Sequence, residues 1–476
     1  MDLVPHEVKA GDHLGDRVLH LQARVHLEEV EAAVVIDKLI AAARATGAQA
    51  VHPGYGFLAE NATFAQACLD ASLTFVGPPP AAIRAMGDKM AARRVAIKMG
   101  VPVVPGTEQP VLDDAEAARV AERVGYPVML KAAMGGGGKG MRLVRAPGEL
   151  TGALRAARSE AGAAFGDAAV YIERYVEDPR HIEIQVLADA HGGVVYLGER
   201  ECSIQRRHQK LVEESPSPFV TPEMRRRMGE AACRVAAAVG YVNAGTVEFL
   251  VDRERTFYFL EMNTRLQVEH PVTELVTGRD LVRDQLRIAA GEKLGFGQDD
   301  VALHGWAIEC RVNAEDPFAG FIPSPGTVLG LRAPGGPWVR DDTGVYAGCT
   351  IPRFYDTLMA KLIVWGTDRD AAIARMSRAL GEYAVAGVQT TIPMLQRIIA
   401  HPDFVAGRLS TGFMDRLLAA DRPEAAGRHR KIALLAAALT AYERAGRPGP
   451  AGGPPAAPAA TPGAWRQALR PGWRSR

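Results

Sequence analysis

Two glutamates, Glu248 and Glu261, occupy positions that a β-hairpin would bring together. Apolar and β-branched residues predict strands at 246–251 and 256–262, and the charged residues 252–255 predict the turn between them. Because opposed side chains on neighbouring antiparallel strands lie about 5 Å apart, this hairpin would place the two carboxylates side by side.

Asn263 follows two residues after Glu261, and so faces the same side of an extended strand. Two carboxylates and an amide oxygen on one surface are hard oxygen ligands suited to Mg²⁺ holding a nucleotide triphosphate. We therefore predict Glu248, Glu261 and Asn263 as metal ligands. A solvated sheet face would explain one such glutamate, but not a set of polar groups in phase beside the apolar residues 258–260.

Arg265, Gln267 and Glu269 continue this alternation, so on an extended chain all three side chains would face one way. Such a group can hold a small anion and present a base to it. The positive charge of Arg265 beside Glu269 would favour the ionised form of that base at neutral pH.

A glycine-rich loop at 135–140 formally satisfies the pattern G-x-G-x-x-G, and Glu160 stands where a ribose-binding acid would be sought. A dinucleotide fingerprint needs a following helix, whereas residues 141–144 alternate as a strand. Lys139 precedes glycine rather than Ser or Thr, which excludes a Walker loop. We predict a flexible flap that closes over phosphates, with Lys131 reaching the α- or β-phosphate. An ordinary glycine turn is the alternative, although consecutive glycines lose much backbone entropy.

Basic residues gather at Arg200 and at 205–210, and a charge run of this kind is usually a solvated face or a nucleic-acid patch. The chain has 56 Lys and Arg against 55 Asp and Glu, a net charge of +1, which argues against nucleic acid. A local basic cluster in a neutral chain fits a site for a small anion better.

The composition is that of an ordinary soluble protein, with 47% hydrophobic residues in 476, enough for about 2–4 domains. Five cysteines without C-x-x-C pairs exclude a zinc ribbon or a disulfide scaffold and suit a reducing cytosol. The first residues do not resemble a signal peptide, and the apolar run 432–439 is far shorter than the ~20 residues of a membrane span. We expect a cytoplasmic protein with no membrane partner.

Residues 34–88 alternate between helix and strand, which predicts an α/β region with helices at 36–46 and 63–71 and strands at 48–52 and 74–77. Residues 89–103 predict a helix and a crossover. The Gly-, Pro- and Ala-rich residues 445–463 have the composition of a linker.

The motifs resemble those of biotin carboxylase, a member of the ATP-grasp group. The resemblance covers about residues 34–418 and is carried, in order, by the segments 52–61, 86–89, 135–141, 173–175, 179–186, 199–210, 261–270 and 309–317.

The resemblance implies an α/β fold, α+β in the lid and the C-terminal domain: an ATP-grasp domain between a partial Rossmann-like domain and a mixed C-terminal domain. The implied parts are 1–88, lacking its first strand, then 89–292 with a lid at about 104–178, then 303–418, and a helical connector with a Pro/Gly/Ala-rich tail at 419–476.

The resemblance also implies an activity and its cofactors. ATP-dependent carboxylation of biotin, with bicarbonate, Mg²⁺ or Mn²⁺ and a carboxyphosphate intermediate, would be the first half-reaction of an acyl-CoA carboxylase. The expected partners are a biotin carboxyl carrier protein or domain, a second copy of the chain and a carboxyltransferase subunit.

Residue roles follow from matching positions. Glu269 would be the base, Arg265, Gln267 and Val268 would hold bicarbonate, Lys210 would stabilise carboxyphosphate, and Arg311 would stabilise the biotin enolate. The metal ligands would be Glu248, Glu261 and Asn263. The nucleotide would contact Lys89, Lys131, Gly137, Gly138, Met141, Glu173, Arg174, Val176, His181, Gln205, His208 and Leu250.

Two departures from the family pattern leave alternatives open. The family's opening segment, roughly "ANRGEIA", is absent, and residues 1–32 match nothing in it, so we expect a truncated N-terminus. The tail resembles the connector of biotin-containing α-subunits but stops before a carrier domain. Another ATP-grasp ligase, such as a carbamoyl-phosphate or purine-carboxylation enzyme, and an inactive truncated remnant are the alternatives.

Lys98 lies in Ala96-Ile-Lys-Met99, which looks like the sequence around a biotin-carrying lysine. Residues 90–99 predict a helix with Gly100 at its C-cap, whereas a carrier lysine needs an exposed hairpin tip. We expect this chain to carry no biotin itself.

Overall fold

The computed structural model describes residues 35–133, 141–354 and 356–420. The elements below lie in a compact unit that ends at Arg416, apart from the last helix, α13 (Phe413–Ala420), which runs past it.

The N-terminal region is a small α/β layer. Residues 35–45 are helical, and the following elements are β1 (Ala50–Val51), η1 (Phe57–Glu60), α2 (Ala62–Asp70) and β2 (Thr74–Phe75). Strands β1 and β2 pair in parallel, as expected when a helix connects them. The Asn61 side chain caps α2 by accepting the amide of Phe64. These elements confirm the helix–strand alternation predicted for this region.

A separate three-stranded sheet follows, with strand order β4-β3-β5. Its strands are β3 (Val128–Ala132), β4 (Arg142–Val144) and β5 (Val170–Arg174), and its helices are α5 (Asp114–Val124) and α6 (Leu150–Phe165), preceded by η2 (Pro147–Glu149). Leu130, Leu154 and Ile172 are fully buried between the sheet and the helices. Strands β3 and β4 form an antiparallel hairpin, which confirms the strand–loop–strand prediction. The glycines that join them lie outside the described residues.

The principal sheet has eight strands in the order β10-β9-β6-β7-β8-β11-β18-β16, and neighbours pair antiparallel throughout. Its strands are β6 (Arg180–Ala188), β7 (Val194–Arg206), β8 (Gln209–Ser215), β9 (Asn243–Val251), β10 (Phe257–Asn263), β11 (Trp306–Asn313), β16 (Val339–Thr343) and β18 (Leu358–Gly366). The observed β9 and β10 confirm the predicted hairpin.

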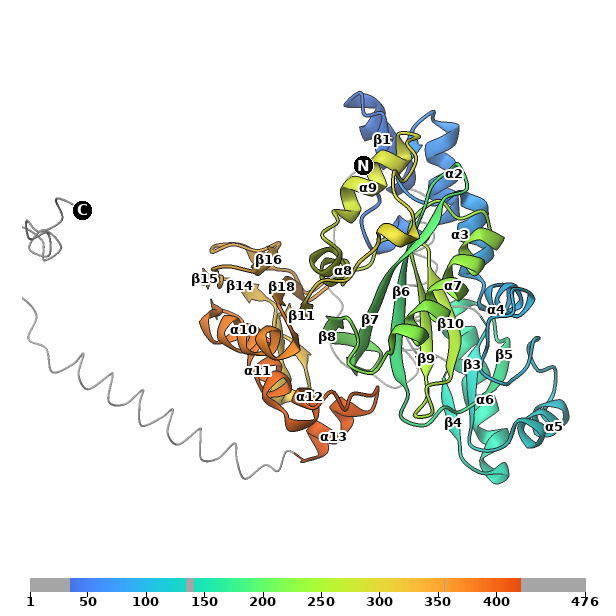
Figure 1. The fold of residues 1–476 in the computed structure, drawn as a ribbon. Helices are drawn as coiled ribbons and strands as arrows, with labels where there is room; N and C mark the ends of the chain where they lie inside the picture. The colour runs from blue at the N-terminus through green and yellow to red at the C-terminus, as the bar shows by residue number, and fades with distance from the viewer. Residues whose placement is uncertain (1–34, 134–140, 355, 421–476) are drawn as a thin grey trace, which may run out of the picture. The chain divides into compact units, whose positions relative to one another are not determined.

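Helices cover this sheet. Helix α7 (Pro222–Ala238) lies along β6 and β7 (Figure 1). Its apolar residues share a core with α3 (Pro80–Gly87), α4 (Lys89–Lys98) and the sheet residues Ile182, Ile184 and Phe249. Helix α8 (His270–Thr277) contacts β7, β8, β11 and β18, and α9 (Leu281–Ala289) contacts β9.

The C-terminal region completes the sheet and adds short elements. Helix α10 (Arg369–Glu382) packs against β11 and β18. The remaining elements are η3 (Gln298–Asp300), β12 (Glu315–Asp316), η4 (Pro317–Ala319), β13 (Ile322–Pro323), β14 (Gly326–Thr327), β15 (Gly330–Arg332), β17 (Thr350–Ile351), β19 (Ala384–Ala386), α11 (Ile392–Ala400) and α12 (Pro402–Val405). Among the described residues, no helix is both long enough and apolar enough to cross a membrane.

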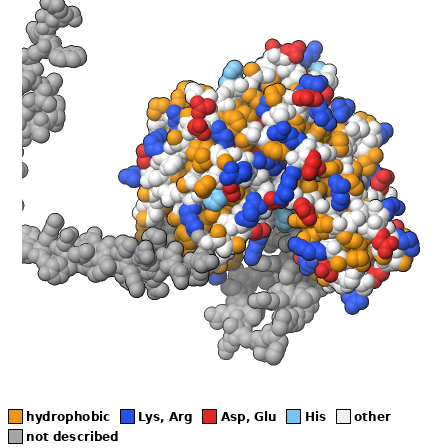
Figure 2. All heavy atoms as spheres, turned by 60° about the horizontal axis from the view of Figure 1, so that its bottom comes forward, with side chains coloured by type: hydrophobic (Ala, Val, Ile, Leu, Met, Phe, Trp, Pro, Cys, Tyr) orange, Lys and Arg blue, Asp and Glu red, His pale blue; other side chains and the backbone are white. Residues whose placement is uncertain are grey.

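Side chains alternate between the two sides of the principal sheet, and we name these sides by their charged residues. The site face carries Glu183, Arg200, Glu248 and Arg311. The back face carries Glu199, Glu201 and Glu214 and lies towards α7 and α10. On the surface shown in Figure 2, basic and acidic side chains are interspersed with apolar ones, which agrees with the near-zero net charge.

Candidate active site

Three glutamates lie in a row across the site face. Glu183 of β6 is the cross-strand partner of Glu248 on β9, and Glu248 is the partner of Glu261 on β10. This register confirms the predicted proximity of Glu248 and Glu261. Like charges opposed across strands repel, so the row requires positive groups to hold it together.

Lys210 of β8 supplies one of these positive groups. Its ammonium donates to Glu183, to Glu248 at 3.1 Å and to Glu269 at 2.7 Å. Burial works to lower the pKa of Lys210, but the surrounding carboxylates raise it well above the usual lysine value. Lys210 is therefore a permanent cation at the centre of the site.

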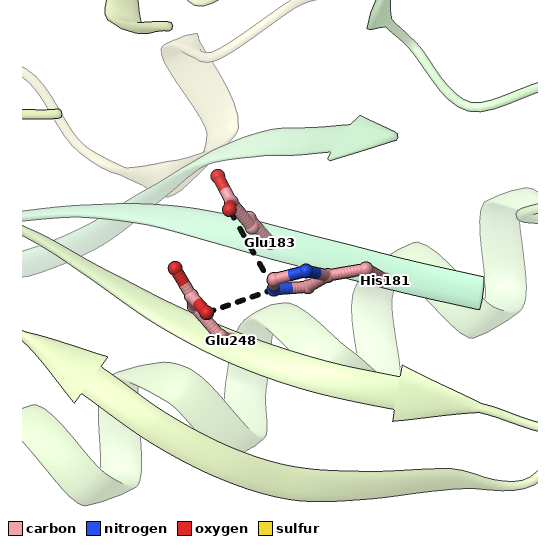
Figure 3. A group of neighbouring side chains, drawn as sticks. All are labelled: His181, Glu183 and Glu248. Carbon is pink, nitrogen blue, oxygen red and sulfur yellow. Dashed lines mark hydrogen bonds and ion pairs between the residues drawn. The ribbon is translucent and has the colours of Figure 1, made fainter. Parts of the chain in front are cut away.

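His181 is the second group that contacts the glutamate row, through Glu248 (Figure 3). His181 Nε2 lies 2.8 Å from Glu248 Oε2, and Glu183 lies on the same side of β6 two residues further on. Burial works to raise the pKa of Glu248, but Lys210 and His181 hold it well below the usual range. Glu248 is thus ionised.

Two amide side chains also donate to Glu248. Asn263 Nδ2 and Gln267 Nε2 each lie 2.8 Å from Glu248 Oε1. The Oδ1 atom of Asn263 accepts from Arg265 at 2.9 Å, and the Oε1 atom of Gln267 accepts from Arg200 at 2.5 Å. Two of the predicted metal ligands, Glu248 and Asn263, therefore form one hydrogen-bonded group with Arg265 and Gln267.

Glu269 directly precedes α8 and lies between two cations, Lys210 at 2.7 Å and Arg311 at 2.8 Å. Burial works to raise its pKa, but Lys210, Arg311 and Arg200 lower it below the usual range. The lowered pKa agrees with the predicted ionised form of Glu269, whose role as a base stays a prediction, but the predicted cause was wrong. Arg265 bonds Glu60 at 3.0 Å instead.

The expectation of an extended alternation from Arg265 to Glu269 was also wrong. The chain leaves the sheet after Asn263, and residues 264–269 form bends and a turn before α8. Pro271, at the first turn of α8, is a helix-start signal that the alternation concealed.

Arg311 of β11 bridges two buried carboxylates. Its Nε atom donates to Glu213 at 2.6 Å and its Nη2 atom donates to Glu269 at 2.8 Å. Burial raises the pKa of Glu213 to about 7, with Arg311 opposing that shift. No role was predicted for Glu213 from the sequence, because Glu213 follows the basic run at 205–210 and belongs to no separate motif.

Arg200 is fully buried and joins several strands of the site face. It donates to Glu183, Gln185, Thr246, Gln267 and Thr273. The sequence placed Arg200 in a basic cluster but did not identify its partners. Neither Arg200 nor Glu183 carries a pattern signal, because β6 and the central part of β7 are buried on both sides.

A second charged group lies beside the three-stranded sheet. Glu173 of β5 accepts from Lys131 at 2.6 Å and from Arg93 at 2.8 Å. Burial lowers the pKa of Lys89, and the negative charge of Glu261 opposes that shift. Arg174 donates to the hydroxyl of Tyr258 at 3.1 Å.

The remaining predicted nucleotide residues occupy several elements. Val176 and Leu250 pack together with Val104 and Tyr258. Gln205 Nε2 lies 3.5 Å from His181 Nδ1, and His208, with φ of 66°, is in the turn between β7 and β8. The Val268 carbonyl accepts from Lys361 at 2.9 Å, and Met141 is half-buried. Gly137, Gly138 and the rest of the predicted flap lie outside the described residues.

Donor atoms of His181, Glu183 and Glu248 all lie within 4.8 Å of one another, and this group shares Glu248 with the predicted metal ligands. The pKa of the neighbouring Glu261 is raised by burial and by the charge of Glu248, so this carboxylate lacks sufficient positive charge nearby. A cation such as Mg²⁺ or Mn²⁺ would relieve that repulsion with oxygen ligands of the preferred kind.

Three family models match the chain in succession. The biotin carboxylase N-terminal domain matches residues 11–83, the ATP-binding domain of the carbamoyl-phosphate synthase L chain matches 88–296, and the biotin carboxylase C-terminal domain matches 309–416. The first match starts before residue 34. The expectation that residues 1–32 resemble nothing in the family is therefore wrong from residue 11 onward.

Relatives of known identity agree with these matches. A biotin carboxylase of Nostoc sp. is 56% identical over 382 residues, covering 80% of this chain and 86% of the relative. Biotin carboxylase 1 of Bacillus subtilis is 51% identical over 381 residues, covering 80% and 85%. The biotin carboxylase domain dimer of Hydrogenobacter thermophilus 2-oxoglutarate carboxylase, solved with MgADP, ADP and bicarbonate, is 48% identical with a TM-score of 0.78, covering 80% and 84%. The chain belongs to the biotin carboxylase family.

Proposed function

We propose that this chain carboxylates biotin on a carrier protein or domain, using ATP and bicarbonate, as the first half-reaction of an acyl-CoA carboxylase. The observation that carries the proposal is the position of Glu269. It lies between Lys210 and Arg311, and Lys210 also reaches the glutamate row that would hold the metal. The proposed base, two cations and two of the proposed metal ligands, Glu248 and Asn263, therefore meet within one hydrogen-bonded group.

The nucleotide would lie between the three-stranded sheet and the glutamate row. Its phosphates would contact Lys89 and Lys131, and Lys131 would exchange its ion pair with Glu173 for the phosphate charge. The other proposed contacts are Gly137, Gly138, Met141, Glu173, Arg174, Val176, His181, Gln205, His208 and Leu250.

Glu248, Glu261 and Asn263 would hold Mg²⁺ or Mn²⁺, which would neutralise charge on the phosphates. The Oδ1 atom of Asn263 accepts a hydrogen bond from Arg265. A rearrangement of the Asn263 side chain would free that oxygen for the metal. Bicarbonate would be held by Arg265, Gln267 and Val268. Val268 joins Gln267 to Glu269 in the chain.

Glu269 would take the proton of bicarbonate while a bicarbonate oxygen attacks the γ-phosphorus. The P–O bond to ADP breaks, and carboxyphosphate and ADP form. The bond between the carboxyl carbon and the phosphate oxygen then breaks, the released phosphate takes the N1′ proton of biotin, and the carboxyl group bonds to N1′. Lys210 would stabilise the carboxyphosphate and Arg311 the biotin enolate, which is electrostatic stabilisation by groups already held in place.

A second ATP-grasp ligase activity is less well supported. The ATP-binding domain alone is shared with the carbamoyl-phosphate synthase L chain, but Arg311 lies in a segment that matches the biotin carboxylase C-terminal domain. An inactive remnant is also disfavoured, because the proposed base Glu269 and the cations Lys210 and Arg311 are all present and in contact.

The family works with a biotin carrier and a carboxyltransferase, and we propose both as partners here. A homodimer is our further proposal, supported by the dimeric Hydrogenobacter thermophilus relative. We also propose a cytoplasmic location, on the basis of the five free cysteines.

The test measures ATP cleavage by the purified full chain with and without bicarbonate and free biotin. We expect cleavage to depend on bicarbonate and to be accelerated by biotin. ATP cleavage at the same rate in all conditions, by a folded protein, would overturn the proposal. Cleavage that depends on bicarbonate but is insensitive to biotin would favour another ATP-grasp ligase.

A further inference from the structure

Lys361 is a buried lysine of β18 that contacts the main chain of the site. Its side chain is 4% exposed, and its ammonium donates to the Val268 carbonyl at 2.9 Å. Val268 joins Gln267 to Glu269, the proposed base. This hydrogen bond therefore acts on the backbone that orients both side chains.

Residues 264–269 depend on such contacts because no strand ladder holds them. The Thr264 amide donates to Glu60 at 2.8 Å. The Gln267 carbonyl accepts from the His270 ring at 2.8 Å. Lys361 provides the corresponding anchor at Val268, and it comes from the C-terminal part of the sheet.

A second tie from the same part of the sheet reaches the helix that follows. Arg340 of β16 donates to Glu274 of α8 at 2.6 Å and to Asp342 at 2.9 Å. Asp342 in turn lies 3.3 Å from the Lys361 ammonium. Strands β16 and β18 therefore hold the Val268 peptide and α8 on both sides of Glu269.

Packing does not explain a lysine at this position. Lys361 is the cross-strand partner of Arg311, and opposed like charges destabilise a sheet. A buried ion pair such as Lys361–Asp342 is often no better for stability than apolar side chains of similar volume. A lysine here is therefore explained by the contact that its ammonium makes.

We propose that Lys361 is a positioning residue for the reaction: its hydrogen bond to the Val268 carbonyl fixes the peptide that aims Glu269 and Gln267 into the bicarbonate site. The reaction itself is the one given under Proposed function, on which this inference rests. The ammonium also adds positive charge beside Arg311 without contacting Glu269 directly.

Three variants test the proposal. Lys361→Met removes the donor and keeps the apolar stem. Arg369→Met is the matched control, because it also removes a partly buried cation from the C-terminal region, where Arg369 bonds Glu214 at 2.7 Å on the back face. Asp342→Asn removes the charged partner of Lys361 but leaves the Val268 carbonyl available as its acceptor.

The first measurement is steady-state kinetics with bicarbonate and ATP varied separately. We expect Lys361→Met to lower kcat/KM for bicarbonate about 10- to 100-fold, as for a misplaced catalytic group, with the KM for ATP changed by less than about twofold. Arg369→Met and Asp342→Asn should keep the bicarbonate parameters close to those of the parent. An equal loss in Lys361→Met and Arg369→Met, or an unchanged kcat/KM for bicarbonate in folded Lys361→Met, would overturn the proposal.

The second measurement is hydrogen exchange of residues 264–270 without substrates, which does not require any activity. We expect faster exchange in Lys361→Met and not in Arg369→Met, and equal exchange in the two would overturn the positioning role. If Lys361→Met does not fold, Lys361→Gln, which keeps a shorter donor, takes its place with the same expectations. A failure of the parent to respond to bicarbonate would instead contradict the proposed function.

Discussion

The two faces of the principal sheet both bury ion pairs, but they neutralise them differently. On the back face each carboxylate has its own arginine: Glu199 accepts two hydrogen bonds from Arg225, and Glu214 accepts two from Arg369. On the site face, Lys210 is shared by three carboxylates, of which Glu183 also accepts from Arg200 and Glu269 also accepts from Arg311. On the back face, the charge of each of these carboxylates is neutralised by its own arginine. On the site face, the described residues include more carboxylates than cations.

This difference shows that a buried ion pair does not by itself mark an active site. In a bidentate arginine–carboxylate pair each charge neutralises the other, so the pair leaves no net charge to attract a metal or an anion. A cation shared among several acids leaves negative charge that a metal can neutralise, as well as a base whose pKa is held low by its neighbours. The number of carboxylates per cation is the feature that separates function from stability here.

The largest expected effect comes from Glu269→Gln on the site face. Glutamine cannot take the bicarbonate proton, so carboxylation should fall by about 10²–10⁴-fold while nucleotide binding stays nearly intact. Glu199→Gln makes the same chemical change on the back face and should retain the activity of the folded protein. Measurements of carboxylation and ATP affinity decide the point, and a Glu269→Gln protein with most of its activity would make Glu269 structural.

Arg369→Met should affect stability rather than chemistry. It leaves Glu214 buried without its charged partner, which is expected to lower the free energy of unfolding by about 3–5 kcal/mol. The activity per folded molecule should be close to that of the parent. Denaturant unfolding together with kinetics tests this, and a large kinetic defect with unchanged stability would break the distinction between the faces.

Glu261→Gln should weaken binding of the metal–nucleotide complex, by about tenfold or more in apparent Mg²⁺ affinity, because a charged ligand is lost. Glu254→Gln, on the turn of the same hairpin, is the matched control. Titration of activity and of nucleotide binding with Mg²⁺ gives the result. If activity and nucleotide binding depend on Mg²⁺ concentration as they do in the parent, Glu261 is excluded as a ligand.

Glu213 should make stability depend on pH. Burial raises its pKa in the folded chain from 4.5 to about 7, so the folded state holds this proton more tightly than the unfolded state. The contribution is present below about pH 4.5 and is lost as the pH rises through about 7, on the order of 3 kcal/mol in total. Thermal unfolding at pH 5 and pH 8 should show a smaller difference for Glu213→Gln than for the parent, and equal differences would contradict the assignment.

The smallest expected effect concerns Lys98 on α4, whose core residues pack on the back-face side of the sheet. Lys98 ends that helix, with Gly100 at φ of 66° just beyond. Co-expression with a biotin ligase should leave the chain unlabelled, as judged by a streptavidin blot. A labelled band at the mass of this chain, lost in Lys98→Ala, would show that it carries biotin.

The sequence was sufficient where local pattern and geometry coincide. The hairpin that pairs Glu248 with Glu261, the strand carrying Lys131 and the helix ending at Lys98 were predicted from alternation, turn residues and caps, and the structure confirms them. Each depends on residues close in the chain. The roles assigned to the site residues remain predictions.

The sequence was insufficient where contacts cross several strands. Glu183 and Arg200 lie on strands buried on both sides, so alternation does not show which face they occupy. The error over Arg265 arose because the strand pattern was extended past Asn263, where the chain turns towards α8. The contact of Lys210 with Glu269 spans 59 residues and depends on the strand order of the sheet.

The ladder between β8 and β11 has a practical consequence for protein engineering. Ala307 to Cys310 pair with Ser215 to Val212, so one continuous sheet crosses the interval between the family-model matches that end at 296 and begin at 309. A cut in that interval would leave two long unpaired strand edges, which favour aggregation. Separate expression of the two pieces should therefore give insoluble protein, and a chimera with a relative should exchange β8 and β11 together.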